Sequence, residues 1–435
     1  MARPVGVPHA DSVARRSLRR PRLGPSGVQR GRIGNSAASG RAVELAVPPP
    51  LARADSLCGK ASTVTAQRHR DLPSRLPDRD HWEVVVIGAG PAGSLAAREL
   101  ARCGHEVLLV ERSKFPRYKV CGGCLNARAV SVLEVVGLGH VLSPQDCHPL
   151  TTFQLQTKSR CVQLPLEGMW SVCRSWFDNR LLEAAVAAGA TPCLGTEARF
   201  TALSDTMPSQ CRWAIGLHRD GREVGRLAAQ TVVLATGLSR ILPGTSSQWQ
   251  TWVDPASRVG VGATFDAHES QYEPGVLSMG VSSTGYVGVV RLANERLNVA
   301  AAVSVPQLRA WGSLQATMES LLTASGLPLP EVGNTTTWKG TPLLTRRTTP
   351  VGRDGLFLIG DAAEYVEPFT GEGMAAALAS GVAVVPHVRQ ALDGETEAAC
   401  RAWSDTHRRL VTRQNRWCRR LTWVLRHPRL ARWSA

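Results

Sequence analysis

The chain has 435 residues, of which 43% are hydrophobic and 20% are charged, a balance typical of a globular protein with two or more domains. No apolar run approaches the roughly 18 residues that a membrane-spanning helix needs, and 11 cysteines without a repeating spacing argue against a disulfide-stapled secreted protein. The net charge of +16 lies at the two ends, because residues 1–80 and 401–435 each carry +9 and the residues between them carry −2. This near-neutral body argues against a nucleic-acid-binding domain. From the odd number of cysteines we expect a reducing compartment and a cytoplasmic protein.

Residues 1–80 are rich in Arg, Ser, Pro and Gly and show no sustained periodicity, which predicts a disordered basic arm. Such a leader is either an organellar transit peptide, which would place the protein in an organelle, or an extension without a targeting role. The acidic residues and prolines within it favour the extension.

A βαβ unit opens the folded body near His81. The sequence predicts a short apolar strand over Glu83–Ile87, a glycine turn, a helix over Ala92–Cys103 and a second strand over Glu106–Val110. Two successive strands joined by a helix require a right-handed crossover, so this unit predicts a parallel sheet.

The turn of this unit has the residues of a dinucleotide-binding site. Gly88 permits the tight turn, Gly90 lets the backbone approach a diphosphate, and Gly93 allows close packing of helix and sheet. The free N–H groups and the dipole of the helix N-terminus then face the phosphates. Glu111 follows the second strand, where a carboxylate accepts from ribose hydroxyls, which favours FAD or NAD over NADP.

Downstream, the hydrophobic pattern alternates between helix and strand periods. A helix over Trp176–Ala188 leads to a strand at Thr191–Leu194. Three alternating segments then predict a small antiparallel sheet, and a buried strand returns to the parallel sheet. The alternating segments are 199–203, 212–218 and 224–228, and the buried strand is 231–235.

From about 250 to 345 the pattern predicts a second domain made mainly of a sheet. Its strands are expected over 260–265, 286–291 and 297–303, and a helix is expected near 314–324. Phe357–Ile359 then returns to the nucleotide-binding sheet, ahead of Gly360 and Asp361. A second glycine turn at Gly371–Gly373 precedes a buried Ala-rich helix over 374–385.

The two glycine-rich segments together resemble the FAD-dependent oxidoreductases of the para-hydroxybenzoate hydroxylase fold, within them the geranylgeranyl reductase-like branch. The resemblance covers residues 82–430 and depends on six motifs. These are Gly88-Ala89-Gly90-Pro91-Ala92-Gly93, Glu111-Arg112, Lys119 to Gly123, Val172 to Asp178, Gly360 to Ala363 and Glu367 to Met374.

The resemblance implies an α/β fold: a Rossmann-like FAD-binding domain (GR2 type), an interposed antiparallel-sheet substrate domain and a C-terminal helical arm. The FAD-binding domain would comprise residues 81–150, 176–245 and 349–397. The substrate domain would comprise 151–175 and 246–348, and the basic amphipathic arm 398–435.

The resemblance also implies which residues contact FAD. The family's aspartate at Asp361 contacts the ribityl or diphosphate part, the turn at Gly371–Met374 lies against the isoalloxazine, and the arginine at Arg174 reaches FAD. For Arg174 the alternative is a surface salt bridge. The predicted cofactor contacts are Gly88, Ala89, Gly90, Pro91, Ala92, Gly93, Glu111, Arg112, Arg174, Gly360, Asp361, Gly371, Gly373 and Met374.

No catalytic residue is identified from the sequence. Cys121, Glu364 and Glu372 are predicted neighbours of the flavin. The Cys121-Gly122-Gly123-Cys124 segment is either a redox dithiol or, as the resemblance favours, a loop beside the flavin. No metal site is expected, because no second CxxC or suitably spaced His pair accompanies it.

Three departures from the family pattern limit the resemblance. Thr236-Gly237 stands where many relatives have Asp-Gly, and Glu364 stands where aromatic hydroxylases usually have His. Tyr286–Arg291 lacks the aromatic residue and proline of the Tyr-x-Trp-x-Phe-Pro segment of prenyl reductases. Reduction of a geranylgeranyl chain specifically is therefore not supported by the sequence.

The C-terminal arm holds four tryptophans among ten arginines, and apolar residues at 410, 417, 421, 424 and 425 keep roughly helical spacing. It is either an interfacial membrane helix or a helix packed on the body with a solvated arginine face. Peripheral membrane contact through this arm is thus one alternative, and no specific nucleic-acid partner is expected.

The sequence therefore predicts an FAD-dependent oxidoreductase, with NAD(P)H as a transient electron donor, that reduces or oxidises a small lipophilic, isoprenoid-like or aromatic substrate. The alternatives are an FAD-dependent aromatic monooxygenase and a flavin-containing factor whose basic arms bind RNA.

Overall fold

The computed structural model describes residues 76–426, except 144, 205, 240, 244–247, 267–269, 333–335, 368 and 370. The expected disordered arm at 1–80 thus lies almost entirely outside the described residues, as do residues 427–435 of the C-terminal arm.

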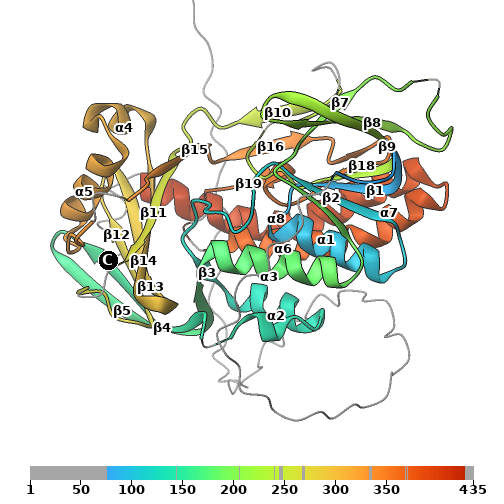
Figure 1. The fold of residues 1–435 in the computed structure, drawn as a ribbon. Helices are drawn as coiled ribbons and strands as arrows, with labels where there is room; N and C mark the ends of the chain where they lie inside the picture. Colours follow the sequence, from blue (N-terminus) through green and yellow to red (C-terminus); the bar gives the residue numbers. More distant parts are fainter. Residues whose placement is uncertain are drawn as a thin grey trace, which may run out of the picture. The chain divides into compact units, whose positions relative to one another are not determined.

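A parallel sheet forms the centre of the nucleotide-binding part (Figure 1). Its strands follow the order β17-β18-β9-β1-β2-β6, and all neighbours pair in parallel except β17 with β18. The strands are β1 (His81–Ile87), β2 (Val107–Glu111), β6 (Thr191–Leu194), β9 (Arg222–Leu234), β17 (Gly352–Arg353) and β18 (Leu356–Leu358). The two strands of the first βαβ unit are adjacent, so the parallel unit expected from the glycine turn is present.

Helices pack on one face of this sheet and on one another. They are α1 (Pro91–Arg102), α2 (Ala127–Val135), α3 (Arg174–Ala187), α6 (Glu372–Ala383) and α7 (Val385–Leu392). Helix α1 contacts both α3 and α6. Gly381 is essential to this packing, because a Cβ there would collide with the backbone of Ala92.

One long strand replaces two that the sequence predicts. Segments 224–228 and 231–235 were expected as separate strands, but β9 runs through both without a turn. Its first half pairs antiparallel with β8 (Trp213–Arg219), which pairs with β7 (Glu197–Thr201), and its second half pairs parallel with β1. The residues between the halves, Ala228-Ala229-Gln230, contain no turn former, so the strand continues.

The second sheet forms the left part of Figure 1 and is almost entirely antiparallel. Its order is β15-β11-β14-β13-β12-β4-β5-β3, and only β12 and β4 pair in parallel. The strands are β3 (Cys124–Leu125), β4 (Cys147–Thr157), β5 (Arg160–Val172), β11 (Val259–Asp266), β12 (Val276–Val281), β13 (Gly285–Leu292), β14 (Arg296–Val303) and β15 (Lys339–Leu343). Helices α4 (Val305–Trp311) and α5 (Leu314–Ser325) cover its outer face.

The second sheet begins earlier in the chain than the expected boundary at residue 150. Strand β3 and the start of β4 lie within the expected first FAD-binding segment, 81–150, yet both belong to the second sheet. The chain therefore crosses to this sheet soon after the Cys121 loop. A short sheet of β10 (Gln250–Val253), β16 (Arg346–Thr349) and β19 (Glu364–Tyr365) joins the two parts.

Helix α8 (Thr396–Arg426) ends the described chain. It packs on α7 and β17 through buried residues that include Trp403, whose indole N–H donates to the Leu358 carbonyl oxygen at 3.1 Å. Among the residues searched, no helix has the length and apolar character needed to cross a bilayer.

Candidate functional site

A cavity of about 770 Å³ lies between the parallel sheet and the inner face of the second sheet. This volume falls in the range of pockets that hold cofactors and their substrates. The glycine turn after β1, the loop after β2 and the N-terminal end of α6 line one half. Strands β12, β13 and β14 of the second sheet line the other half.

The first glycine turn places an uncapped helix N-terminus at the cavity wall. Gly90 is the N-cap of α1, no side chain caps it, and Pro91 occupies the first turn. Gly88 has a φ of +108°, and a Cβ on Gly93 would collide with the Gly88 carbonyl. At Gly90, by contrast, a Cβ would meet only Arg117 Nη2 at 3.6 Å. This end of α1 can therefore be approached closely by an anion.

Glu111 lies beside this turn at the end of β2, with 8% of its surface exposed. Its Oε2 accepts from the Ala89 N–H at 3.0 Å and its Oε1 from the Ser113 N–H at 2.9 Å. Each carboxylate oxygen has a further lone pair, so the group is held rigidly and can still accept from a ribose hydroxyl.

The opposite wall is formed by the second glycine-rich segment. Gly360 and Asp361 lie in a short 3-10 turn (η3, Gly360–Ala362), and Gly371 is the N-cap of α6 with a φ of +71°. Helix α6 begins at Glu372, two residues before the expected helix over 374–385, and again no side chain caps it. A second uncapped helix end therefore points to the same cavity.

A buried charge network flanks the cavity. Asp178 accepts from Arg174 through both carboxylate oxygens, at 2.8 and 2.9 Å, and Arg117 Nη2 lies 3.3 Å from the same group. The Asp178 side chain is fully buried. Burial alone would raise the pKa of Asp178, but Arg174 and Arg117 outweigh it and the pKa is lowered. Asp178 thus fixes two cations at the cavity wall.

Lys119 and Asp361 form the other charged part of this wall. Burial lowers the pKa of Lys119, and the charge of Asp361 opposes this shift. Burial likewise raises the pKa of Asp361, against the charges of Lys119 and Arg174. Five of the residues that line the cavity are Lys or Arg and three are Asp or Glu, which suits an anionic ligand.

Most of the residues predicted to contact a cofactor line the cavity. Arg174 does so while it pairs with Asp178, so the pair is buried and not a surface salt bridge. Ala89 and Gly93 lie behind the wall, and neither Glu364 nor Glu372 is among the lining residues. The lining residues from the prediction are Gly88, Gly90, Pro91, Ala92, Glu111, Arg112, Cys121, Arg174, Gly360, Asp361, Gly371, Gly373 and Met374.

Sequence reasoning did not assign roles to Arg117, Lys119 and Asp178. The last two stand within motifs of the family resemblance, which was the available signal. Their function depends on a tertiary arrangement. Arg117 follows β2 and Asp178 lies in α3, so the two residues are far apart in the chain and meet only in the folded protein.

The Cys121 to Cys124 loop is tied to the second sheet. Both cysteines are free thiols. Asn298 of β14 donates to the Cys121 carbonyl oxygen at 2.9 Å, and Cys124 Sγ donates to the Gly122 carbonyl oxygen at 3.4 Å. Both cysteines line the cavity, but Cys121 is half-buried and Cys124 is only 7% exposed. This arrangement favours a loop beside the cavity over a dithiol.

We expect iodoacetamide to alkylate Cys121 in the folded protein and to leave Cys124 unmodified. Burial, and then the neighbouring Cys121, raises the pKa of the Cys124 thiol, and the thiolate is the reacting form. Fragmentation mass spectrometry of the labelled peptide locates the modified sulfur. Equal labelling, or a disulfide between the two in freshly prepared protein, would restore the dithiol interpretation.

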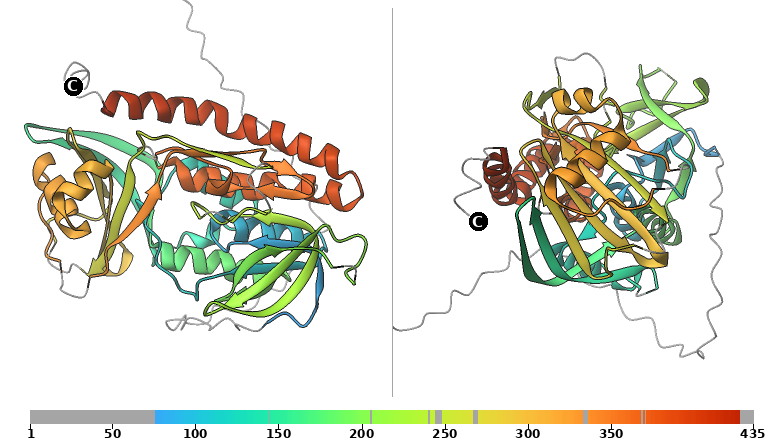
Figure 2. Two further views of the ribbon diagram at one scale, coloured as in Figure 1. Left: turned by 90° about the horizontal axis from the view of Figure 1, so that it is seen from above. Right: turned by 90° about the vertical axis from the view of Figure 1, so that its left-hand side faces the viewer.

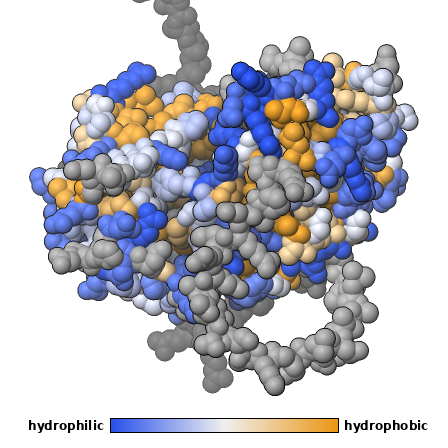
Figure 3. Space-filling model, in the orientation of Figure 1, coloured by the Kyte–Doolittle hydropathy of each residue, from blue (hydrophilic) through white to orange (hydrophobic). Residues whose placement is uncertain are grey.

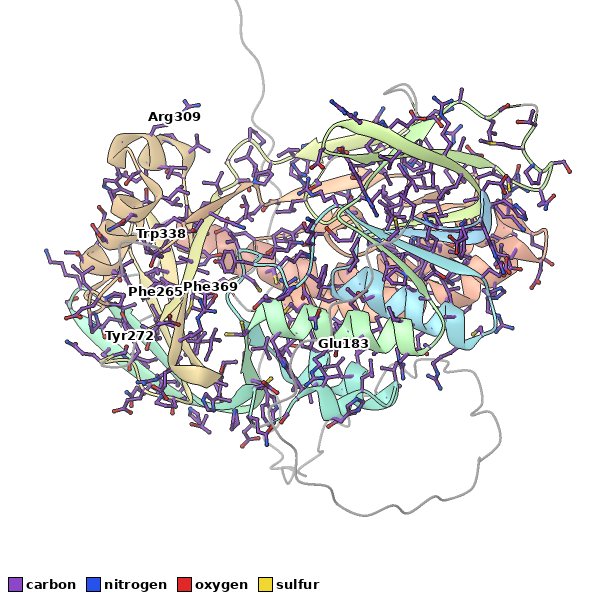
Figure 4. All side chains as sticks on the ribbon, viewed as in Figure 1. Glu183, Phe265, Tyr272, Arg309, Trp338 and Phe369 are labelled. Atoms are coloured by element: carbon purple, nitrogen blue, oxygen red, sulfur yellow. The ribbon has the colours of Figure 1, made fainter. Side chains whose placement is uncertain are left out.

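The far half of the cavity is apolar. Tyr286 and Phe369 meet edge-to-face with ring centroids 5.0 Å apart, and Figure 4 marks Phe369 between the second sheet and the helices of the nucleotide-binding part. Behind them, Arg258 and the fully buried Glu367 form an ion pair at 2.7 Å. The apolar lining residues include Phe153, Leu166, Met169, Leu277, Met279, Ala300, Ala302, Leu344 and Phe369.

The described chain matches the FAD binding domain family over residues 81–416. A menaquinone reductase of Mycolicibacterium smegmatis is 29% identical over 317 residues, which cover 69% of this chain and 74% of that protein. Digeranylgeranylglycerophospholipid reductase 1 of Methanopyrus kandleri is 30% identical over 318 residues, or 69% of this chain and 78% of that protein.

Solved structures support the same fold at low identity. A myxobacterial chondrochloren halogenase superposes with a TM-score of 0.66 at 20% identity, over 78% of this chain and 82% of the other. A geranylgeranyl bacteriochlorophyll reductase-like protein of Thermoplasma acidophilum gives 0.63 at 18% identity, over 80% and 88%. Reductases and halogenases thus share this architecture.

Proposed function

The chain belongs to the FAD binding domain family and is an FAD-dependent oxidoreductase, and from this premise we propose that it uses NAD(P)H to reduce a carbon–carbon double bond in an isoprenoid-like, lipophilic substrate. The observation that carries the proposal is the apolar far half of the cavity, which adjoins the charged half. Menaquinone and digeranylgeranyl lipids, after which two relatives are named, both carry isoprenoid chains.

The residues of the charged half fit FAD. The uncapped N-terminus of α1 with the open position at Gly90 suits its diphosphate, and Glu111 suits a ribose. The N-terminal end of α6 suits the pyrimidine edge of the isoalloxazine. FAD, when bound, supplies hydride transfer between the nicotinamide and the substrate.

The chain's own residues would orient the substrate and exclude water. Tyr365 lines the cavity, and burial raises its pKa well above the usual value. It therefore keeps its proton at neutral pH and can donate a hydrogen bond but cannot act as a base. Tyr286 and Phe369 would hold the substrate's double bond against the isoalloxazine beside the N-terminal end of α6.

The test is NAD(P)H oxidation with a menaquinone and with a geranylgeranyl lipid, measured with and without oxygen. We expect turnover without oxygen and a product that carries two added hydrogens in its isoprenoid chain, located by fragmentation mass spectrometry, because reduction of a quinone ring adds the same mass. Turnover that needs oxygen and adds an oxygen atom would instead establish the monooxygenase alternative, and turnover with neither substrate would contradict the substrate class.

Replacing Leu277 by tryptophan should lower kcat/KM for a long-chain substrate by about 10- to 100-fold and leave the flavin content unchanged. Leu277 is half-buried and lines the apolar half only, so the larger ring occupies the space of the substrate chain. Leu329→Trp, at a residue 54% exposed, is the matched control. Equal kcat/KM values for the two variants would show that the substrate does not bind in the apolar half of the cavity.

A further inference from the structure

The apolar inner face of the second sheet continues beyond the cavity onto the β4–β5 hairpin. Residues that pair directly across adjacent strands have their side chains on the same face. Two such rows cross β12, β4 and β5, and each row starts from a residue that lines the cavity. The rows are Leu277–Phe153–Leu164 and Met279–Leu155–Val162.

The outer ends of both rows are open to solvent. Leu164 is 52% exposed and Val162 44% exposed. The opposite face of the hairpin is polar, with Gln163 donating to Gln154 at 3.4 Å. In the described part of the chain, β5 pairs beyond β4 only with β3, at Ser171 and Trp170. The hairpin therefore presents an apolar face along a free edge.

Positive charge stands at the turn of this hairpin. Lys158 and Arg160 stand at the hairpin turn, and the hairpin's one carboxylate, Glu167, stands near its other end. Figure 2 shows the ribbon of α8 extending from the nucleotide-binding part to the side of the second sheet. In Figure 3, apolar side chains form groups between hydrophilic ones.

We propose that the β4–β5 hairpin docks on an anionic lipid bilayer, with Val162 and Leu164 inserted among the lipid chains and Lys158 and Arg160 against the headgroups. The two apolar rows then connect the bilayer to the cavity, so a lipophilic substrate enters along them without crossing water. The geometry of the hairpin supports the docking surface independently of the reaction. The role of the two rows as an entry route for the substrate rests on the proposed function.

A second copy of the chain fits this edge less well. Pairing edge to edge requires backbone N–H groups, and Pro165 in β5 has none. The cationic turn also matches anionic headgroups and gives no complement to itself.

The experiment compares the full chain with Val162→Thr/Leu164→Gln in co-sedimentation with phosphatidylcholine vesicles that contain phosphatidylserine. We expect about tenfold weaker binding for this variant. A Lys158→Ser/Arg160→Ser variant should bind these vesicles more weakly, and its remaining binding should no longer depend on salt. The matched control, Leu203→Gln/Val224→Thr, changes two exposed apolar residues on the other part of the protein. Thermal melting and flavin content confirm that each variant is folded.

Vesicle binding by Val162→Thr/Leu164→Gln equal to that of the full chain would overturn the proposal, as would a full chain that does not bind. A full chain that dimerises in light scattering, and a variant that does not, would identify a second copy as the occupant. Vesicle binding needs no substrate, so it is independent of the proposed reaction. With a short-chain, water-soluble substrate the variant should keep its activity, and absence of that turnover in every variant would count against the reaction alone.

Discussion

Replacing Gly90 by valine is expected to give a folded protein that has lost at least about 100-fold in affinity for FAD, or roughly 2.7 kcal/mol. Gly90 has a φ of −79° and a ψ of −177°, which any residue adopts, and an added Cβ meets only the end of the Arg117 side chain. The new side chain would occupy the space in which a diphosphate reaches the free N–H groups of α1.

The measurement is the flavin absorbance of the purified protein, followed by titration of the stripped protein with FAD. Gly225→Val is the matched control, because a Cβ at Gly225 in β9 has nothing within 4 Å. Gly88→Val should instead fail to fold, since Gly88 has a positive φ and a Cβ there would collide with the Ala235 backbone. Full flavin content in a stable Gly90→Val protein would refute the assignment of the diphosphate site.

The first nucleotide-binding unit could be predicted because its signals are local. An apolar strand, a glycine turn and a helix of small residues are contiguous in the sequence, and the structure has β1, α1 and β2 within one or two residues of the expected bounds. The second glycine turn gave the position of α6 for the same reason.

The structure differs from the sequence-based predictions where tertiary contacts determine the conformation. Strand β9 pairs antiparallel with β8 and then parallel with β1 within one sheet, so the predicted separate antiparallel sheet is absent, and the alternating pattern does not reveal this. Arg174 and Asp178 are four residues apart, a spacing that also fits an exposed helical pair. Only the packing of α3 against α1 buries them beside the cavity.

Replacing Asp178 by alanine is expected to lower the free energy of unfolding by about 3–5 kcal/mol, because it leaves buried guanidinium groups without their partner. Arg174 and Arg117 are only 9% and 13% exposed and both contact this carboxylate. The corresponding fall in melting temperature is on the order of 10 °C. Thermal and urea unfolding at neutral pH measure both quantities.

The pH dependence of this stabilisation has a defined sign. The pKa of Asp178 is lowered from its usual 3.8, because the two arginines outweigh the opposing effect of burial. A carboxylate with a depressed pKa stabilises the fold above its unfolded pKa and loses that effect as the pH falls through its folded pKa. The stability gap between the natural protein and Asp178→Asn should therefore stay constant down to about pH 3.8 and narrow below it.

The effect of FAD on the melting temperature tests whether the charges around Asp178 act on the cofactor or only on the fold. A bound diphosphate brings negative charge to the wall that holds Arg174 and Arg117, so FAD should raise the melting temperature of Asp178→Ala more than that of the natural protein. Glu183→Ala is the control: Glu183 is on the same helix, pairs with Arg180 and is 27% exposed (Figure 4), and should cost less than about 1 kcal/mol. An equal effect of FAD on all three proteins would show that the charges of Arg174 and Arg117 do not act on the bound cofactor.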